Sequence, residues 1–203
     1  MAKLKAPLLS LGASGAIGKS IVFFPWKGID AVREYVIPAN PKTDPQILQR
    51  SYLTAAVATI HNAEAHTIDP LSAVDKTAYA LYGSTFPTPR TWFNQIVQRW
   101  LLAEVNGEKA TVYKAGTFTD PATTEITITL RNQVTGGQAG SFYCGTSKTS
   151  MPKSVVADGV GTLHTGVFTG LTKGVKYFFQ FRPDPVADAK YVCRSGIYHH
   201  VST

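Results

Sequence analysis

The spacing of hydrophobic residues changes near Asn106-Gly107. Before this point, three segments carry apolar residues at every third or fourth position, which predicts amphipathic helices. After it, the chain is rich in Thr, Val, Gly and aromatic residues that alternate with period two, which predicts short strands. The sequence therefore predicts an α+β fold with a domain boundary near these two residues.

Each predicted helix is preceded by a capping residue and a proline. The three pairs are Asp44-Pro45, Asp69-Pro70 and Thr88-Pro89. Proline suits the first helical position because its φ is already helical and its missing N–H has no partner to lose there. The apolar stripes that follow end at Ala63, Gly83 and Asn106-Gly107. We expect them to cover one another in a three-helix domain over residues 46–107.

Residues 1–45 are predicted to form an extended arm and a β-hairpin. Two runs of strand-forming residues, over 21–24 and 32–37, flank Lys27-Gly28, which predicts the hairpin. Residues 1–19 are rich in Gly and Ala and should become ordered only by lying on another surface. We predict that the arm and the hairpin contact a neighbouring copy through apolar side chains, which are Leu4, Leu8, Leu9, Leu11, Ile17, Phe23, Trp26 and Tyr35.

Residues 108–203 are predicted to form an antiparallel β-sandwich of about seven strands. The strands are expected near 109–118, 124–131, 140–146, 153–157, 162–168, 175–182 and 190–201, with a turn at Asp158-Gly159 among others. Alternation places Ile126, Ile128 and Leu130 inside and the intervening threonines outside. The aromatic residues Tyr177, Phe179 and Phe181 should point inward in the same way.

The stretch Thr169-Gly-Leu-Thr-Lys-Gly-Val-Lys-Tyr-Phe-Phe-Gln-Phe resembles the end of strand E and the start of strand F in fibronectin type III domains. In that family a buried Leu lies six residues before the Tyr of a tyrosine corner, and Leu171 and Tyr177 fit these places. At or near the position that usually holds a Trp in the second strand, this chain has Leu130. The resemblance implies a fibronectin type III-like sandwich over residues 108–203.

A second resemblance covers about the first 50 residues. Gly15-Ala-Ile-Gly, Val22-Phe-Phe-Pro-Trp-Lys-Gly and Pro38-Ala-Asn-Pro-Lys-Thr-Asp-Pro-Gln are similar to the opening of a group of uncharacterised proteins encoded among bacteriophage structural genes. The resemblance implies a place in the virion and no particular chemistry.

Candidate chemical motifs have simpler structural explanations. The segment Ala13-Ser-Gly-Ala-Ile-Gly-Lys-Ser matches a permissive phosphate-binding loop, but the residues after it favour a strand over the helix that phosphate binding needs. The histidines lack metal-ligand spacing. Cys144 and Cys193 are expected on strands too far apart for a disulfide, which favours free thiols. We therefore expect no catalytic site, no cofactor and no metal.

The net charge of +7 is spread along the chain, and no run of three basic residues occurs. This pattern favours a solvated surface over a specific nucleic-acid site. No apolar run is long enough to span a membrane, and the N-terminus does not resemble a signal peptide. We expect synthesis in the host cytoplasm.

These observations favour a non-enzymatic structural protein of a bacteriophage virion, as a capsid or tail subunit or a decoration. Its partners would be copies of itself and other virion proteins, with at most weak contact to the host surface through an outward-facing sandwich. The alternative is an extracellular filament or cell-surface protein whose sandwich binds a glycan or a host protein. An enzyme that uses the lysine-bearing arm on nucleotides ranks last.

Overall fold

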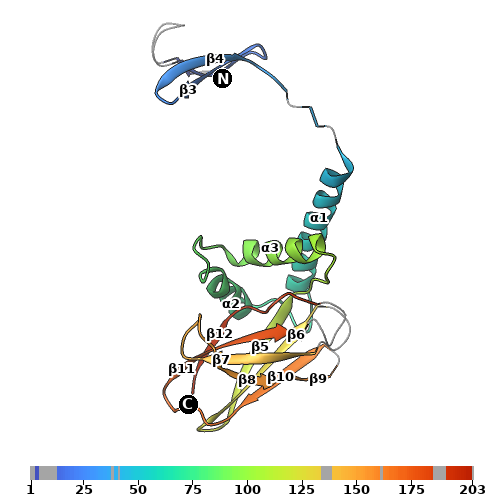
Figure 1. Ribbon diagram of the computed structural model, residues 1–203, viewed down its shortest axis with the longest axis vertical. Coiled ribbons are helices and arrows are strands. Elements are labelled where there is room, and N and C mark those ends of the chain that lie inside the picture. Colours follow the sequence, from blue (N-terminus) through green and yellow to red (C-terminus); the bar gives the residue numbers. More distant parts are fainter. Residues whose placement is uncertain are drawn as a thin grey trace. The chain divides into compact units, whose positions relative to one another are not determined.

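Three helices and three four-stranded antiparallel sheets make up the computed structural model, which is therefore α+β (Figure 1). The structure describes residues 3–4, 13–37, 39–40, 42–133, 139–160, 162–184 and 191–202. The chain divides into two compact units, Met1–Thr43 and Asp44–Thr203. The predicted boundary near Asn106-Gly107 lies inside the second unit, because the helices pack on the sheets that follow them.

The first unit is a meander with the strand order β1-β2-β3-β4. Its strands are β1 (Lys3–Leu4), β2 (Ala13–Ile17), β3 (Ile21–Trp26) and β4 (Ile29–Glu34). The predicted hairpin is confirmed as β3 and β4. The prediction of an extended arm is wrong for residues 13–17, which form β2 and pair with β1 and β3 of their own chain. Gly18, with φ of 57°, reverses the chain there, and backbone pairing adds the strand although its side chains are small.

The helices are α1 (Asp44–Glu64), α2 (Ala73–Gly83) and α3 (Trp92–Val105). The N-caps of α2 and α3 are Ser72 and Thr91, so the predicted starts at Asp69 and Thr88 are three residues early. Ser72 and Asp75 form a capping box, in which each side chain accepts a hydrogen bond from the other's backbone N–H. This reciprocal pair stabilises the helix end more than a proline three residues upstream can.

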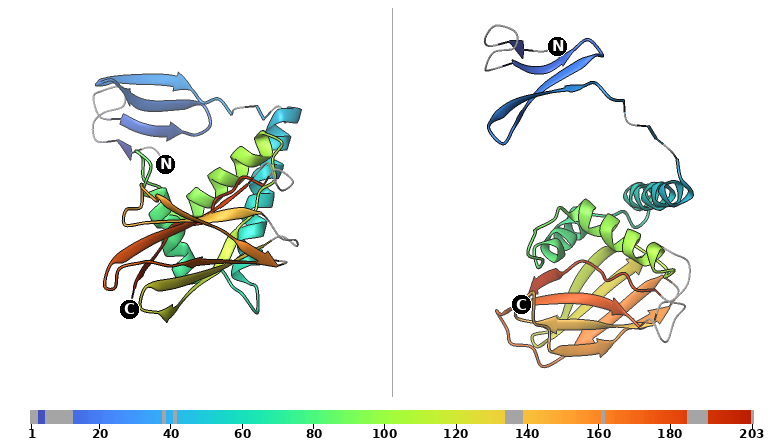
Figure 2. Two further views of the ribbon diagram at one scale, coloured as in Figure 1. Left: turned by 60° about the horizontal axis from the view of Figure 1, so that its bottom comes forward. Right: turned by 45° about the horizontal axis from the view of Figure 1, so that its top comes forward.

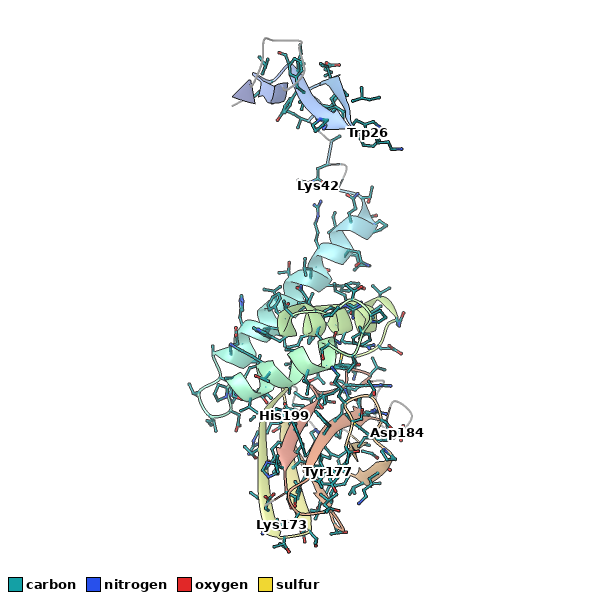
Figure 3. The ribbon with its side chains drawn as sticks, turned by 90° about the vertical axis from the view of Figure 1, so that its left-hand side faces the viewer. Trp26, Lys42, Lys173, Tyr177, Asp184 and His199 are labelled. Atoms are coloured by element: carbon teal, nitrogen blue, oxygen red, sulfur yellow. The ribbon has the colours of Figure 1, made fainter. Side chains whose placement is uncertain are left out.

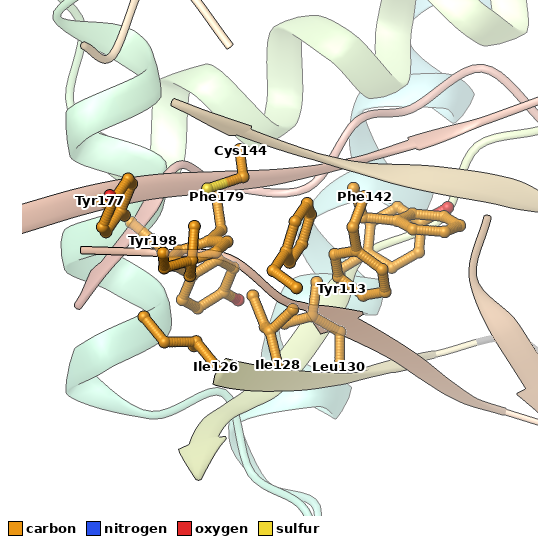
Figure 4. Close-up of a cluster of buried hydrophobic side chains, with 13 residues drawn as sticks. Tyr113, Ile126, Ile128, Leu130, Phe142, Cys144, Tyr177, Phe179 and Tyr198 are labelled. Carbon is orange, nitrogen blue, oxygen red and sulfur yellow. The ribbon is translucent and has the colours of Figure 1, made fainter. Parts of the chain in front are cut away.

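Two sheets of the second unit face each other across one hydrophobic core (Figure 4). One has the order β5-β6-β10-β9 and the other β12-β11-β7-β8. Their bounds are β5 Tyr113–Ala122, β6 Glu125–Asn132, β7 Gly140–Gly145, β8 Lys153–Val156, β9 Asp158–Val160, β10 Leu163–Phe168, β11 Lys176–Pro183 and β12 Tyr198–Val201.

The predicted inward residues of β6 and β11 are confirmed, because all six are buried. Two strand predictions need correction. Asp158-Gly159, expected as a turn, begins β9, which pairs with β10. The last strand covers only residues 198–201, since the backbone before it bonds elsewhere: Ile197 N–H donates to the Ala78 carbonyl of α2 and Ser195 N–H to the Phe181 carbonyl.

Helix α2 is joined to the sheets by polar contacts, and Figure 2 shows the helices against one side of them. The carboxylate of Asp75 is fully buried. It accepts hydrogen bonds from the backbone N–H and the hydroxyl of Ser72, the N-cap of its own helix. It also accepts from the backbone N–H groups of Ala115 and Gly116 in β5 and from the Tyr198 hydroxyl in β12. A register shift in β5, with φ of 52° at Ala115, presents its two N–H groups to this carboxylate.

A second contact lies one turn further along α2. The Tyr79 hydroxyl donates to the Tyr113 carbonyl and accepts from the Tyr113 N–H. Of the apolar stripe expected on α2, Leu71, Ala78 and Tyr82 are buried as predicted, but Val74 is exposed, and Asp75 and Tyr79 are buried as well. Buried polar groups of this kind are stable only when they are hydrogen-bonded, as both are.

Candidate self-assembly surface

The β3–β4 hairpin ends in a two-residue turn with positive φ at both positions. Lys27 has φ of 51° and Gly28 of 82°, as the tight turns between twisted strands require. The turn places Trp26 opposite Ile29 at the hairpin tip, where their side chains are 61% and 70% exposed. Figure 3 shows Trp26 projecting from this tip. An exposed aromatic and aliphatic pair is unusual on a surface that only meets water.

One face of the sheet carries apolar side chains from three strands. Ile17 lies opposite Ile21, and Phe23 lies opposite Val32. Residues paired in this way point to the same side of a sheet, and so do residues two apart in one strand. Phe23 is buried at 8% exposure, whereas the other three are exposed. This face, defined by Ile17, Ile21, Phe23 and Val32, is called the hairpin face below.

The opposite side carries a different set. Phe24 lies on this side, and the guanidinium carbon of Arg33 is 5.3 Å from the centre of its ring. The Trp26–Ile29 pair lies on the same side, nearer the tip of the hairpin. Arg33 covers Phe24 partly, as the stacking of a cation on an aromatic ring allows. Apolar side chains therefore lie on both sides of a single-layered sheet.

The predicted contact residues do not share one surface. Ile17 and Phe23 share the hairpin face, whereas Trp26 lies on the other side. Tyr35 follows β4 and is tied to the sheet by a hydrogen bond from its N–H to the Ser20 carbonyl. Leu4 lies in β1, and Leu8, Leu9 and Leu11 lie outside the described residues. The prediction missed Ile21, Ile29 and Val32, although alternation within the hairpin could have identified them.

A single sheet with little buried surface needs a second layer. Among the described residues of this unit, Phe23 alone is a buried hydrophobic residue. Small sheets become stable when a second layer or a helix covers an apolar face. Each large apolar side chain that becomes fully buried contributes roughly 1.5 to 3 kcal/mol. Covering the hairpin face and the tip would therefore stabilise the unit substantially.

Helix α1 offers a further apolar surface within the second unit. Its buried residues, Ala56, Ile60 and Ala63, all lie in the C-terminal half of the helix. The N-terminal half exposes Ile47, Leu48 and Leu53. A hollow of about 440 Å³ lies beside Leu53 and is lined by Leu53, Thr54, Val57, Ala58 and His61. The first turns of α1 thus show the same pattern of exposed apolar side chains as the sheet.

The candidate chemical motifs are placed as follows. Residues 13–20, which resemble a phosphate-binding loop, form β2 and the turn after it, and β3 follows where such a loop requires a helix. Within the described parts of the chain, His, Cys, Asp and Glu side chains form no group of three that could hold a metal ion. None of the described helices has both the length and the hydropathy needed to cross a membrane.

No protein-family model matches the chain, and no curated protein sequence matches it. Among solved structures, the crystal structure of a bromine derivative of BhCBM56 is similar at 10% sequence identity and a TM-score of 0.35. The match covers 46% of this chain and 96% of that chain.

Proposed function

We propose that this protein is a non-enzymatic structural subunit of a bacteriophage virion that assembles with copies of itself through the hairpin face. The observation that supports this most directly is a four-stranded unit whose apolar side chains are mostly exposed on both sides. The similarity of the first 50 residues to proteins encoded among phage structural genes supports the virion as the location. Other virion proteins would then be further partners.

In this proposal, the neighbouring copy supplies the second layer that the sheet lacks. Strand β4 lies at an end of the sheet, so its outer edge could also receive a strand from a neighbour. The contact surface would include β2, which residues 13–17 form in place of the free arm that we expected there. The exposed N-terminal half of α1 would be a second contact.

We further propose that residues 108–203 form a fibronectin type III-like sandwich that faces outward from the assembly. The strand order supports this, because β5-β6-β10 opposite β12-β11-β7 matches an A-B-E sheet facing a G-F-C sheet. The tyrosine corner also supports it: the Tyr177 hydroxyl accepts a hydrogen bond of 2.9 Å from the backbone N–H of Thr172, and Leu171 is buried beside it.

The test is the oligomeric state of the full chain with one charge on the hairpin face. Val32→Lys places an ammonium group among Ile17, Ile21 and Phe23, so we expect the assemblies of the parent protein to dissociate in sedimentation velocity. Val156→Lys is the matched control, since Val156 is also exposed but lies on β8 of the second unit. A parent protein that stays monomeric at all concentrations, or a Val32→Lys variant that assembles normally, would contradict the proposal.

A further inference from the structure

A polar cleft lies on the second unit, where β7 and β11 meet the segment before β12. It has a volume of about 390 Å³ and is lined by Tyr143, Arg182, Pro183, Val192 and Arg194. Two of these five residues are arginines, and none carries a negative charge. The cleft is therefore a positively charged hollow that is separate from the hairpin face.

Arg182 is held in a fixed position at this cleft. Its Nε donates a hydrogen bond of 3.1 Å to the Gln180 side chain, and its guanidinium carbon lies 4.2 Å from the centre of the Tyr143 ring. Burial, followed by the nearby charge of Arg194, lowers the pKa of Arg182 from its ordinary value. The fold thus brings two like charges together at a cost to stability.

Neighbouring arginines also lie on aromatic rings. The guanidinium carbon of Arg99 lies 5.4 Å from the ring centre of Tyr82 and 5.3 Å from that of Phe86, and Arg90 lies 4.6 Å from Phe86. In the described part of the chain, the ion pairs join Lys76 to Glu64, Arg131 to Asp69, and His200 to Asp120. None of them involves the arginines around the cleft.

The interior behind the cleft supplies no negative charge either. A small cavity of about 10 Å³ shares Arg194 with the cleft, and Tyr82, Gln95, Arg99 and Thr111 are among its other lining residues. Four buried polar atoms of the residues that line this cavity have no partner within the described structure: Tyr82 Oη, Gln95 Nε2, Arg99 Nε and Thr111 Oγ1. The two nitrogens can only donate, and the hydroxyls are neutral. None of the described residues that line the cleft and this cavity therefore offsets the charge of the arginines.

We propose that the cleft binds an oxoanion group, such as a phosphate, sulfate or carboxylate, between Arg182 and Arg194. Guanidinium groups match the geometry of such oxygens with two parallel hydrogen bonds, and the stacking of Arg182 on Tyr143 already fixes the orientation of one of them. The cleft is large enough for the anionic group and part of the molecule that carries it. This site does not depend on the assembly proposal, because every residue in it belongs to the second unit.

The test is a titration of the full chain with inorganic phosphate at constant ionic strength. Binding is measured by calorimetry and by the shifts of the arginine Nε–H signals in NMR. We expect saturable binding that shifts the Arg182 signal. Arg182→Gln and Arg194→Gln should each weaken phosphate binding at least about tenfold. Arg194 is exposed, so its variant should fold even where Arg182→Gln does not.

Lys173→Gln is the matched control. It removes one exposed positive charge at the opposite end of β11 from Pro183, and Figure 3 labels Lys173 there. Its effect on phosphate affinity should be less than about twofold, because exposed charges so far apart are screened by salt. Titration with glucuronate distinguishes the source of the group: tighter binding than phosphate would identify a sugar carboxylate, and weaker binding a phosphoryl or sulfuryl group.

Three results would overturn the proposal: no saturable binding of either probe, equal loss of affinity in Lys173→Gln, or the same response to chloride alone. A chain that remains monomeric yet binds phosphate would contradict only the assembly proposal. A chain that assembles but binds neither probe would contradict only this one.

Discussion

The Tyr198 hydroxyl of β12 donates a hydrogen bond of 2.7 Å to Asp75 of α2, a residue 123 positions earlier in the chain. Both side chains are fully buried. Burial and the charge of Asp75 raise the pKa of Tyr198 well above its ordinary value, so the phenol stays protonated and remains a donor. Because Asp75 also accepts hydrogen bonds from β5, its carboxylate links α2 to both sheets.

Asp75→Asn should destabilise the second unit by about 3 kcal/mol or more, because an amide group replaces an oxygen that accepts from buried donors. Urea unfolding followed by circular dichroism measures this loss. Glu64→Gln is the control: it removes a carboxylate whose ion pair with Lys76 is partly exposed, and it should cost about 1 kcal/mol or less. Equal losses in the two variants would show that Asp75 does not join the layers.

Gly196→Ala should also destabilise the unit, by about 1 to 3 kcal/mol. A Cβ at this position would lie 2.7 Å from the Ala78 carbonyl carbon and the Tyr79 nitrogen, so α2 would have to move away from the strand. Thermal unfolding of the variant and the parent measures this, and a lower melting temperature of the variant is the expected result. If this space were free, the lower entropy of the unfolded chain would make the alanine variant more stable.

His164 should make folding sensitive to acid. Burial lowers its pKa below the ordinary value of 6.5, and neither ring nitrogen has a hydrogen-bond partner in the described structure. Below pH 6.5 the unfolded chain binds a proton that the folded chain does not, so stability is full above this pH and is lost as the pH falls toward the folded pKa. The loss approaches about 1.4 kcal/mol per pH unit.

The measurement is urea unfolding of the parent and of His164→Leu between pH 7.5 and 5. The other histidines contribute equally to both proteins, so the difference between them isolates His164. We expect a shallower pH dependence in the variant. Identical slopes would mean that His164 binds its proton equally well in the folded and the unfolded chain, which would contradict the prediction.

The two cysteines should be unreactive in the folded protein. Both are buried and free, and burial raises the pKa of the Cys144 thiol to about 12 and that of Cys193 to about 11. Because the thiolate is the reactive form, an aromatic disulfide reagent should label neither thiol until urea is added, and then both. Mass spectrometry of protein purified without reductant should find both as thiols. A Cys144–Cys193 disulfide would instead favour the extracellular alternative.

Local patterns predicted much of the fold. Lys27-Gly28 marked the hairpin turn, and the alternation around Ile128 and Phe179 identified the inner faces of two strands. The predictions failed where contacts distant in sequence decide the structure. Sequence patterns predict that an aspartate such as Asp75 is exposed. The fold buries it, because hydrogen-bond donors from β5 and β12 surround its carboxylate. The short strand β9 forms only because β10 lies beside it.

The two candidate sites also differ in how far local sequence could predict them. Ile17 and Phe23 could be predicted from composition and alternation, because the hairpin face depends on local pairing. The arginine cleft could not, because Arg182 and Arg194 lie on different segments and line the same cleft only once the chain is folded. A charge count cannot predict that proximity, since the positive charges are spread along the chain.

The contact between Asp75 and Tyr198 also orders events during translation. Helix α2 leaves the ribosome long before β12 does, so Asp75 cannot accept its hydrogen bond from Tyr198 until β12 has been made. Until then, one acceptor position of a carboxylate that the finished fold buries completely is open to water. The attachment of α2 to the second sheet should therefore be completed only after β12 has been synthesised.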